Sequence, residues 1–492
     1  MALHDKISSC LLGGGGLETL STFWSRYRVH FPDHPLFRDH GHHLQFCLPL
    51  LMHADEGRYL KREQLLIMSW QSMIGEGTRP QRDYRSEADC RETQGLNFKG
   101  SSYRTRFLLA TLLSLHYRKK NRDGDRLKNL LNAVVDDFLE FYRAGVEVVF
   151  QGTRIKFYGI LLNLKGDWPM LSKLGNLKQH FGRKTKGGAP TEQSAICHLC
   201  RAGCAGYPYH EFEINAKWYE TYLQRRPWST PSPFMRLPMP AAPELFFCFD
   251  MFHVTHKGVL AELTVALLDM GLFVPGDIPT RLDKIYDDLK SFCRTSGVSL
   301  HLTRLTRQLV GLKDDSCYPS GTWFKGADTA AICKFVEHTF GQLTAPAGFE
   351  LYCECIHLAA EASNTVLSCM YTSGLWLRPM EASAIARHSL CFARRFRECS
   401  ELAFQMEKCR FRITPKYHAY VHLTHAVIQQ LGNLVDEVLE NDTPAILNPL
   451  SYSCQLDEDY IGSIAMLSRT TTTGHVHEGT MNRYLVTLQR EW

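Results

Sequence analysis

The sequence predicts an α/β protein in which a mixed sheet flanked by helices is interrupted by a large, mainly helical insertion. Strand-like apolar runs gather before residue 170, and helix-like patterns fill most of 257–440. A segment rich in cysteine and then in proline separates the two regions. Hydrophobic periodicity is the main signal for both kinds of element.

The first two strands are predicted from neighbouring apolar runs. The run FCLPLLMHADEGR reaches Asp55 and Glu56, and a second run begins at Gln64 after a polar turn. Two such runs so close together are typical of a hairpin. The next run, RTRFLLATLLSLHY, fits a strand or a helix, because its length is compatible with both.

A helix and a further strand follow. Residues 125–142 carry apolar side chains at helical spacing, which predicts an amphipathic helix. After VEVVF and a turn at Gly152, the run RIKFYGILLNLKGDWP predicts a strand that ends at Asp167. The order is therefore strand, strand, third strand candidate, helix, strand, with acids where the first and last strands end.

Length and composition limit the number of domains and the class of protein. The 492 residues are enough for two or three domains, and 44% hydrophobic residues suffice for a large core. The net charge of +5 permits nucleic-acid binding without arguing for it. Seventeen cysteines in so long a chain, with no signal-peptide pattern and no membrane-length apolar run, indicate an intracellular protein with free thiols.

We predict five segments along the chain. They are an N-terminal extension at 1–43, the first part of a catalytic core at 44–176, a Cys-rich insert and Pro-rich linker at 177–243, a mainly helical insertion at 244–445, and the C-terminal part of the core at 446–492.

Three acids are candidates for a two-metal site. Mg²⁺ prefers oxygen ligands, and phosphodiester cleavage by two ions needs several carboxylates converging from separate segments. Asp55 and Asp167 follow apolar strands, and Glu458 lies in the acidic cluster 457–459. Taken singly, each has a structural alternative: the two Asp residues as turn formers or helix caps, and the cluster as a charged helix N-terminus.

Asp250 and His253 form a D-x-x-H pair directly after the run LFFCF. One helical turn would place both side chains on the same face, as a carboxylate and an imidazole near a scissile phosphate. The alternative is an N-cap Asp beside a partly buried His. The sequence also leaves open whether Asp250 replaces Asp167 as the second metal ligand.

Cysteines and basic residues give two further candidate sites. Cys197, Cys200, Cys204 and His210 have the short spacing of a zinc-knuckle-like structural site, with plain thiols or a redox pair as alternatives. The residues flanking Asp167 are basic and are candidates for phosphate contacts or simply a solvated face. They are Lys165, Lys173, Lys178, Arg183, Lys184 and Lys186.

The order of these motifs resembles the CACTA and Plavaka transposases, which are of the DDE type. The matching stretches are LPLLMHADEG, LKGDWPMLSKLGNL, CHLC, FDMFHVTHKGV and LDEDYIG, with weaker similarity in GTWFKGADT and RITPKYHAYVHLTH. The resemblance spans about residues 44–470. In relatives the final motif is often an aromatic residue followed by Glu, so Leu456-Asp457-Glu458 leaves open which acid is meant.

The resemblance implies an RNase H-like core and an enzyme that cleaves and transfers DNA strands. Asp55, Asp167 and Glu458 would hold two Mg²⁺ or Mn²⁺ ions, Asp250 and His253 would support the phosphate, and the cysteine pair would belong to a Zn²⁺ site. The expected partner is double-stranded DNA at transposon ends, with no membrane, in the nucleus; a homo-oligomer is compatible with this. The alternatives are an inactive or domesticated relative that binds nucleic acid, and a zinc-stabilised interaction protein.

Overall fold

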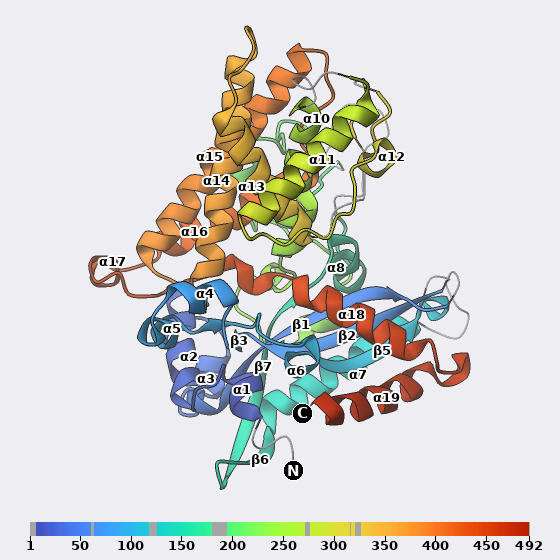
Figure 1. The fold of residues 1–492 in the computed structure, drawn as a ribbon. Helices are drawn as coiled ribbons and strands as arrows, with labels where there is room; N and C mark the ends of the chain where they lie inside the picture. Colours follow the sequence, from blue (N-terminus) through green and yellow to red (C-terminus); the bar gives the residue numbers. More distant parts are fainter. Residues whose placement is uncertain are drawn as a thin grey trace.

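Five strands form a mixed sheet in the lower half of the molecule as drawn in Figure 1. The computed structural model describes residues 6–60, 63–117, 125–179, 194–270, 276–314, 316–319 and 326–491. The strand order is β5-β2-β1-β7-β6, and only β1 and β7 run parallel. The strands are β1 (Cys47–Arg58), β2 (Gln64–Ser72), β5 (Phe107–Leu113), β6 (Val146–Phe150) and β7 (Thr153–Lys165).

The α/β prediction is confirmed at this level. The apolar runs at 46–58 and 64–75 pair as an antiparallel hairpin. The ambiguous run after Arg104 is a strand, β5, because it extends the sheet beside β2. The predicted amphipathic helix is α7 (Arg126–Arg143), which packs on β7. The first strand is longer than predicted and continues past Asp55 to Arg58, paired with β2.

Alternate side chains along each strand pack into two different cores, one on each face of the sheet. Leu66 and Met68 of β2 belong to the core shared with α7 and the N-terminal helices, whereas Leu65 and Ile67 pack under α18 (Gln455–Ser468) and α19 (Val476–Glu491). Successive side chains of a strand point to opposite faces, so both faces are covered. The N-terminal helices are α1 (Ile7–Leu11), α2 (Glu18–His30) and α3 (Leu36–Asp39).

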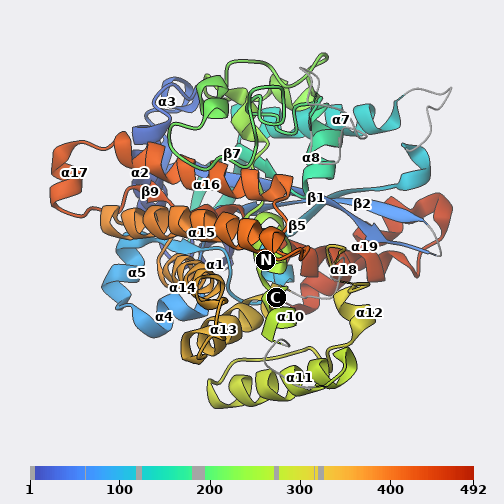
Figure 2. The same cartoon turned by 90° about the horizontal axis from the view of Figure 1, so that it is seen from above.

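The predicted mainly helical region stands above the sheet in Figure 1, and Figure 2 shows α14, α15 and α16 from above. Its core is separate from the sheet core and includes the cysteine segment. No helix in the described part of the chain has the length and apolar character needed to cross a membrane. The helices are α9 (Leu260–Leu263), α10 (Ala266–Met270), α11 (Ile278–Thr295), α12 (Arg307–Val310), α13 (Gly326–Gln342), α14 (Glu350–Thr372), α15 (Pro379–Gln405), α16 (Pro415–Gly432) and α17 (Asp436–Glu440).

Short elements connect the two regions. Phe247, in the run LFFCF, forms a parallel bridge with Leu164 at the end of β7. A π-helix, Phe252–Val259, follows and leads into the helical region. The remaining elements are β3 (Ile74–Gly75), α4 (Arg79–Tyr84), α5 (Glu87–Thr93), β4 (Gly95–Leu96), α6 (Ser102–Thr105), α8 (Trp168–Gly175), β8 (Trp376–Leu377) and β9 (Ile446–Leu447).

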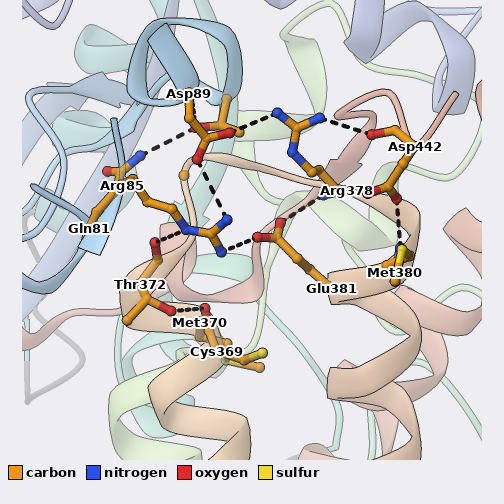
Figure 3. Close-up of polar contacts among 12 residues, drawn as sticks. Gln81, Arg85, Asp89, Cys369, Met370, Thr372, Arg378, Met380, Glu381 and Asp442 are labelled. Carbon is orange, nitrogen blue, oxygen red and sulfur yellow. Dashed lines mark hydrogen bonds and ion pairs between the residues drawn. The ribbon is translucent and has the colours of Figure 1, made fainter. Parts of the chain in front are cut away.

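A cluster of alternating charges joins α4 and α5 to the helical region (Figure 3). The Asp89 carboxylate accepts a hydrogen bond from Arg378 at 2.7 Å and lies 3.5 Å from a nitrogen of Arg85. Arg85 also pairs with Glu381, whose carboxylate accepts from the backbone N–H of Arg378 at 2.9 Å. We call Arg85, Asp89, Arg378 and Glu381 the charge cluster.

Candidate active site

The strand pairing brings Asp55 and Asp167 to the same edge of the sheet. His53 on β1 pairs with Lys165 on the parallel strand β7. Asp55 follows His53 by two residues, and Asp167 follows Lys165 by two residues. Gly166 permits this close approach, because a Cβ atom there would lie 2.8 Å from the carbonyl oxygen of Ala54. The two carboxylates interact, since Asp167 is among the groups that raise the pKa of Asp55.

Glu458 approaches the same place from α18. Asp55 is opposite Ile67 in the antiparallel pair, and residues opposite each other share a face. Ile67 packs beneath α18, so Asp55 points toward the helix whose first turn carries Glu458. Burial, together with the charges of Asp167 and Glu458, raises the pKa of Asp55 to about 8. Three carboxylates from separate segments therefore form one acidic centre.

The three adjacent acids of α18 have three different environments. Asp457 is fully buried and accepts a hydrogen bond from Lys165 Nζ at 2.7 Å, with Arg106 Nε 3.6 Å away. Asp459 is exposed and accepts from Ser102 Oγ at 2.9 Å. Of the three acids, Glu458 is the one whose charge is among the main causes that raise the pKa of Asp55, which favours it as the acid of the final motif.

Asp167 has a structural role as well. One of its oxygens accepts a hydrogen bond from the Met170 backbone N–H at 2.7 Å and so caps the N-terminus of α8. The cap fixes the carboxylate on the rigid end of a helix. The structural alternative for this residue is therefore correct, and it is compatible with a ligand role because the carboxylate has a second oxygen.

Asp250 and His253 form a bridge to Glu458. The buried Asp250 carboxylate accepts from the backbone N–H groups of Phe252 and Cys454, both at 2.8 Å, and pairs with His253 Nδ1. His253 Nε2 lies 3.4 Å from a Glu458 oxygen. Burial acts to lower the pKa of His253, but the charges of Asp250 and Glu458 and the hydrogen bond raise it overall. The D-x-x-H pair thus holds the N-terminus of α18. With the backbone N–H of His253, which donates at 3.1 Å, Asp250 is already engaged by four donors.

A second cluster consists of Cys197, Cys200, His418 and His422, all buried, with their ligand atoms within 4.8 Å of one another. Cys200 Sγ lies 3.2 Å from His418 Nε2 and 3.4 Å from His422 Nε2, and Cys197 Sγ lies 3.6 Å from His422 Nε2. A tetrahedral zinc ion with ordinary bond lengths places sulfur and nitrogen ligands about 3.6 Å apart. The donor set and its spacing fit zinc.

The possible zinc ligands that the structure brings together differ in two members from the predicted set. Cys197 and Cys200 belong to the cluster, but the exposed His210 and the buried Cys204 are not members of it. The two histidines come instead from α16, where a spacing of four residues puts them on one face. Both histidines lie in the stretch RITPKYHAYVHLTH, where H-x3-H on a helix is the sequence signal for a pair of metal ligands.

The predicted basic surface also needs correction. Lys165 is fully buried in its ion pair with Asp457, so it cannot contact a phosphate. Lys173 pairs with Glu56 at 2.6 Å, and Lys178 is exposed. Arg183, Lys184 and Lys186 lie outside the described residues. Sequence reasoning missed Lys416, which lines a small cavity with Asp167 and His253.

Comparison with known proteins adds no family to this geometry. No protein-family model matches the chain, and no curated protein matches its sequence. Function therefore has to be argued from the two clusters themselves.

Proposed function

We propose that the protein is a transposase-like enzyme with an RNase H-like core that cleaves and transfers DNA strands, with two Mg²⁺ or Mn²⁺ ions held by Asp55, Asp167 and Glu458. The observation that supports this most is the meeting of three carboxylates from β1, the end of β7 and α18. Oxygen ligands of this kind suit hard divalent cations. Transposon DNA as the substrate and a nuclear location come from the resemblance alone.

The electrostatics of the acidic centre favour bound cations. Burial, and after it repulsion from Asp167 and Glu458, raises the pKa of Asp55 to about 8, and a bound cation would offset both effects. Divalent ions in such a site activate a water or hydroxyl nucleophile and stabilise the leaving oxygen of a phosphodiester. Without metal, the carboxylates of Asp55 and Glu458 would add repulsion beside Asp167, whose cap of α8 needs neither of them.

The surrounding residues keep the acids in place. Lys165 and Arg106 hold Asp457, which fixes the first turn of α18 and with it the direction of Glu458. Asp250 holds the backbone N–H of Cys454, immediately before the same helix. Catalytic groups need such rigid support, because small displacements of a ligand shell reduce activity strongly.

We also propose that Cys197, Cys200, His418 and His422 hold a structural zinc ion. The ion would join the segment that contains Cys197 and Cys200 to α16. Cys200 and His418 are 218 residues apart in the sequence. Four protein ligands close the coordination shell, as in structural rather than catalytic zinc sites. Its role would be to fix α16 beside the acidic centre.

Nicking of supercoiled plasmid in Mg²⁺ or Mn²⁺ tests the enzyme proposal. Asp55→Asn, Asp167→Asn and Glu458→Gln should each abolish nicking, and Asn still caps α8 at position 167. Asp459→Asn is the matched control, because it removes the next acid of the same helix but leaves the acidic centre intact. Nicking that survives in the three variants, or is absent from the wild type despite metal-dependent thermal stabilisation, contradicts strand cleavage at this site.

A further inference from the structure

Lys416 lies at the edge of the acidic centre. It lines a cavity of about 90 Å³ together with Asp167, Asp250 and His253, and with apolar side chains including Trp168 and Phe249. About 10–15 Å³ of such space admits one water molecule, so the cavity takes a group of several heavy atoms. It lies directly beside one of the proposed metal ligands, Asp167.

The lysine side chain is held in place along its length. Its Nζ donates a hydrogen bond to the backbone carbonyl of Lys257 at 2.7 Å. Its stem crosses Gly258, where a Cβ atom would lie 3.0 Å from Lys416 Cδ and 3.2 Å from its Cβ. Gly258 also has non-helical dihedral angles, φ −121° and ψ −105°, inside the π-helix. The glycine therefore makes room for the lysine stem beside the segment that carries Asp250 and His253.

The helix that carries Lys416 is fixed by the Cys/His cluster. His418 and His422 follow Lys416 by two and six residues on α16, and both are buried against Cys200. Trp218 packs against both imidazole rings. The start of α16 is thus tied to the cysteine segment, and Lys416 is presented at a defined position over the acidic centre.

We propose that this cavity receives a phosphate group of the substrate strand and that Lys416 donates to it. An ammonium group has three N–H donors, and the Lys257 carbonyl uses one of them. A phosphodiester beside Asp167 needs positive charge to offset the nearby carboxylates, and a positioned lysine supplies it together with bound metal ions. This inference rests on the proposed function and adds a residue that touches the substrate.

The competing role for Lys416 is charge balance among acids. The negative charges of the Asp250, Glu262 and Asp167 carboxylates all attract the positive charge of Lys416. A lysine that only balances acids would alter metal affinity when removed but would leave DNA affinity and its salt dependence unchanged. A phosphate contact predicts the opposite pattern, since each phosphate neutralised by a lysine releases counterions.

DNA binding separates the two roles without requiring catalysis. The test uses the full chain, a short fluorescently labelled duplex and Ca²⁺ in place of Mg²⁺, over a series of salt concentrations. Lys416→Met should weaken binding and reduce the slope of log affinity against log salt by about 0.9. Lys416→Arg should restore most of the slope. Lys290→Met, an exposed lysine on α11, is the control for general loss of charge.

Nicking and thermal shift complete the test. Lys416→Met should keep the Mn²⁺-induced rise in melting temperature but lower the nicking rate about 100-fold, as loss of one oxyanion donor does. Gly258→Ala should also lower nicking, because its Cβ atom would lie 2.9 Å from the His253 carbonyl oxygen and 3.0 Å from Lys416 Cδ. A wild-type salt slope in Lys416→Met, or a wild type that binds no DNA, overturns the inference. A reduced slope in a protein that never nicks supports the phosphate contact while rejecting the proposed enzyme.

Discussion

Lys165 Nζ lies 2.7 Å from an oxygen of Asp457, and both side chains are fully buried between β7 and α18. The other Asp457 oxygen lies 3.6 Å from Arg106 Nε, and Lys165 also donates to the Ser453 carbonyl at 3.0 Å. Asp457, the acid of this ion cluster, directly precedes Glu458 in the sequence. The ion cluster ties α18 to the end of β7, two residues before Asp167.

Asp457→Asn should therefore destabilise the protein strongly. It leaves the buried Lys165 and Arg106 without a carboxylate, and breaking a buried ion pair in this way costs about 3–5 kcal/mol. Thermal melting should show a clear fall in the melting temperature, together with a smaller Mn²⁺-induced rise because Glu458 is no longer fixed. Asp459→Asn, one residue further, should change neither quantity. Equal melting temperatures for the two variants would contradict the structural role of Asp457.

Zinc content distinguishes the two possible ligand sets. Purified protein should contain one zinc ion per chain, measured by elemental mass spectrometry. Cys200→Ala and His422→Ala should lose it, because each removes one of four ligands. Cys204→Ala and His210→Ala should retain it, since neither residue belongs to the cluster. Zinc loss in the His210 variant, or a metal-free wild type, would contradict the proposed site.

The acidic centre was predictable from sequence because strand ends and the late acid follow local rules. Asp55 and Asp167 each end an apolar run, and parallel pairing of β1 with β7 then places them together. The pattern of the strand also indicates the role of Lys165. It precedes Asp167 by two residues, so it shares the face of the strand that α18 buries, where a charge needs a partner.

The zinc ligands illustrate what the sequence could not supply. Cys204 and His210 fit the pattern of a local zinc site because they are close to Cys200 along the chain. His418 and His422 reach the cysteines only because α16 folds back onto that segment. Nothing in the periodicity of either segment fixes this long-range packing. The same holds for Lys416, whose position depends on Gly258, 158 residues earlier.

The charge cluster predicts a local effect on exchange dynamics. Arg378 connects Asp89 on α5 with the Asp442 carbonyl, at 2.7 and 3.1 Å (Figure 3). Arg378→Met removes both contacts and the ion pair with Glu92, and partly exposed ion pairs contribute at most about 1 kcal/mol each. Hydrogen–deuterium exchange should become faster in α5 and the first turn of α15, while β1 keeps its protection. Arg387→Met, exposed on the same helix, is the control and should leave exchange at wild-type rates.

His34 predicts a specific loss of stability in acid. It is buried among Tyr27 and Phe37, and its Nδ1 accepts the Leu36 backbone N–H at 3.1 Å, which requires the unprotonated form at that atom. Burial lowers its pKa to about 4, despite the opposing charges of Asp33 and Asp39. The unfolded chain therefore binds a proton at higher pH than the folded chain does, and stability falls as the pH drops from about 6.5 to about 4.

Replacing His34 should remove that part of the pH dependence. By linkage, His34 accounts for about 2 kcal/mol of lost stability between pH 8 and pH 5. In His34→Asn the side-chain oxygen replaces the Nδ1 acceptor but does not titrate, so the melting temperature should fall less between these pH values than in the wild type. His42→Gln, at an exposed position, should follow the wild-type curve. If His34→Asn also follows the wild-type curve, protonation of His34 is not what destabilises the fold in acid.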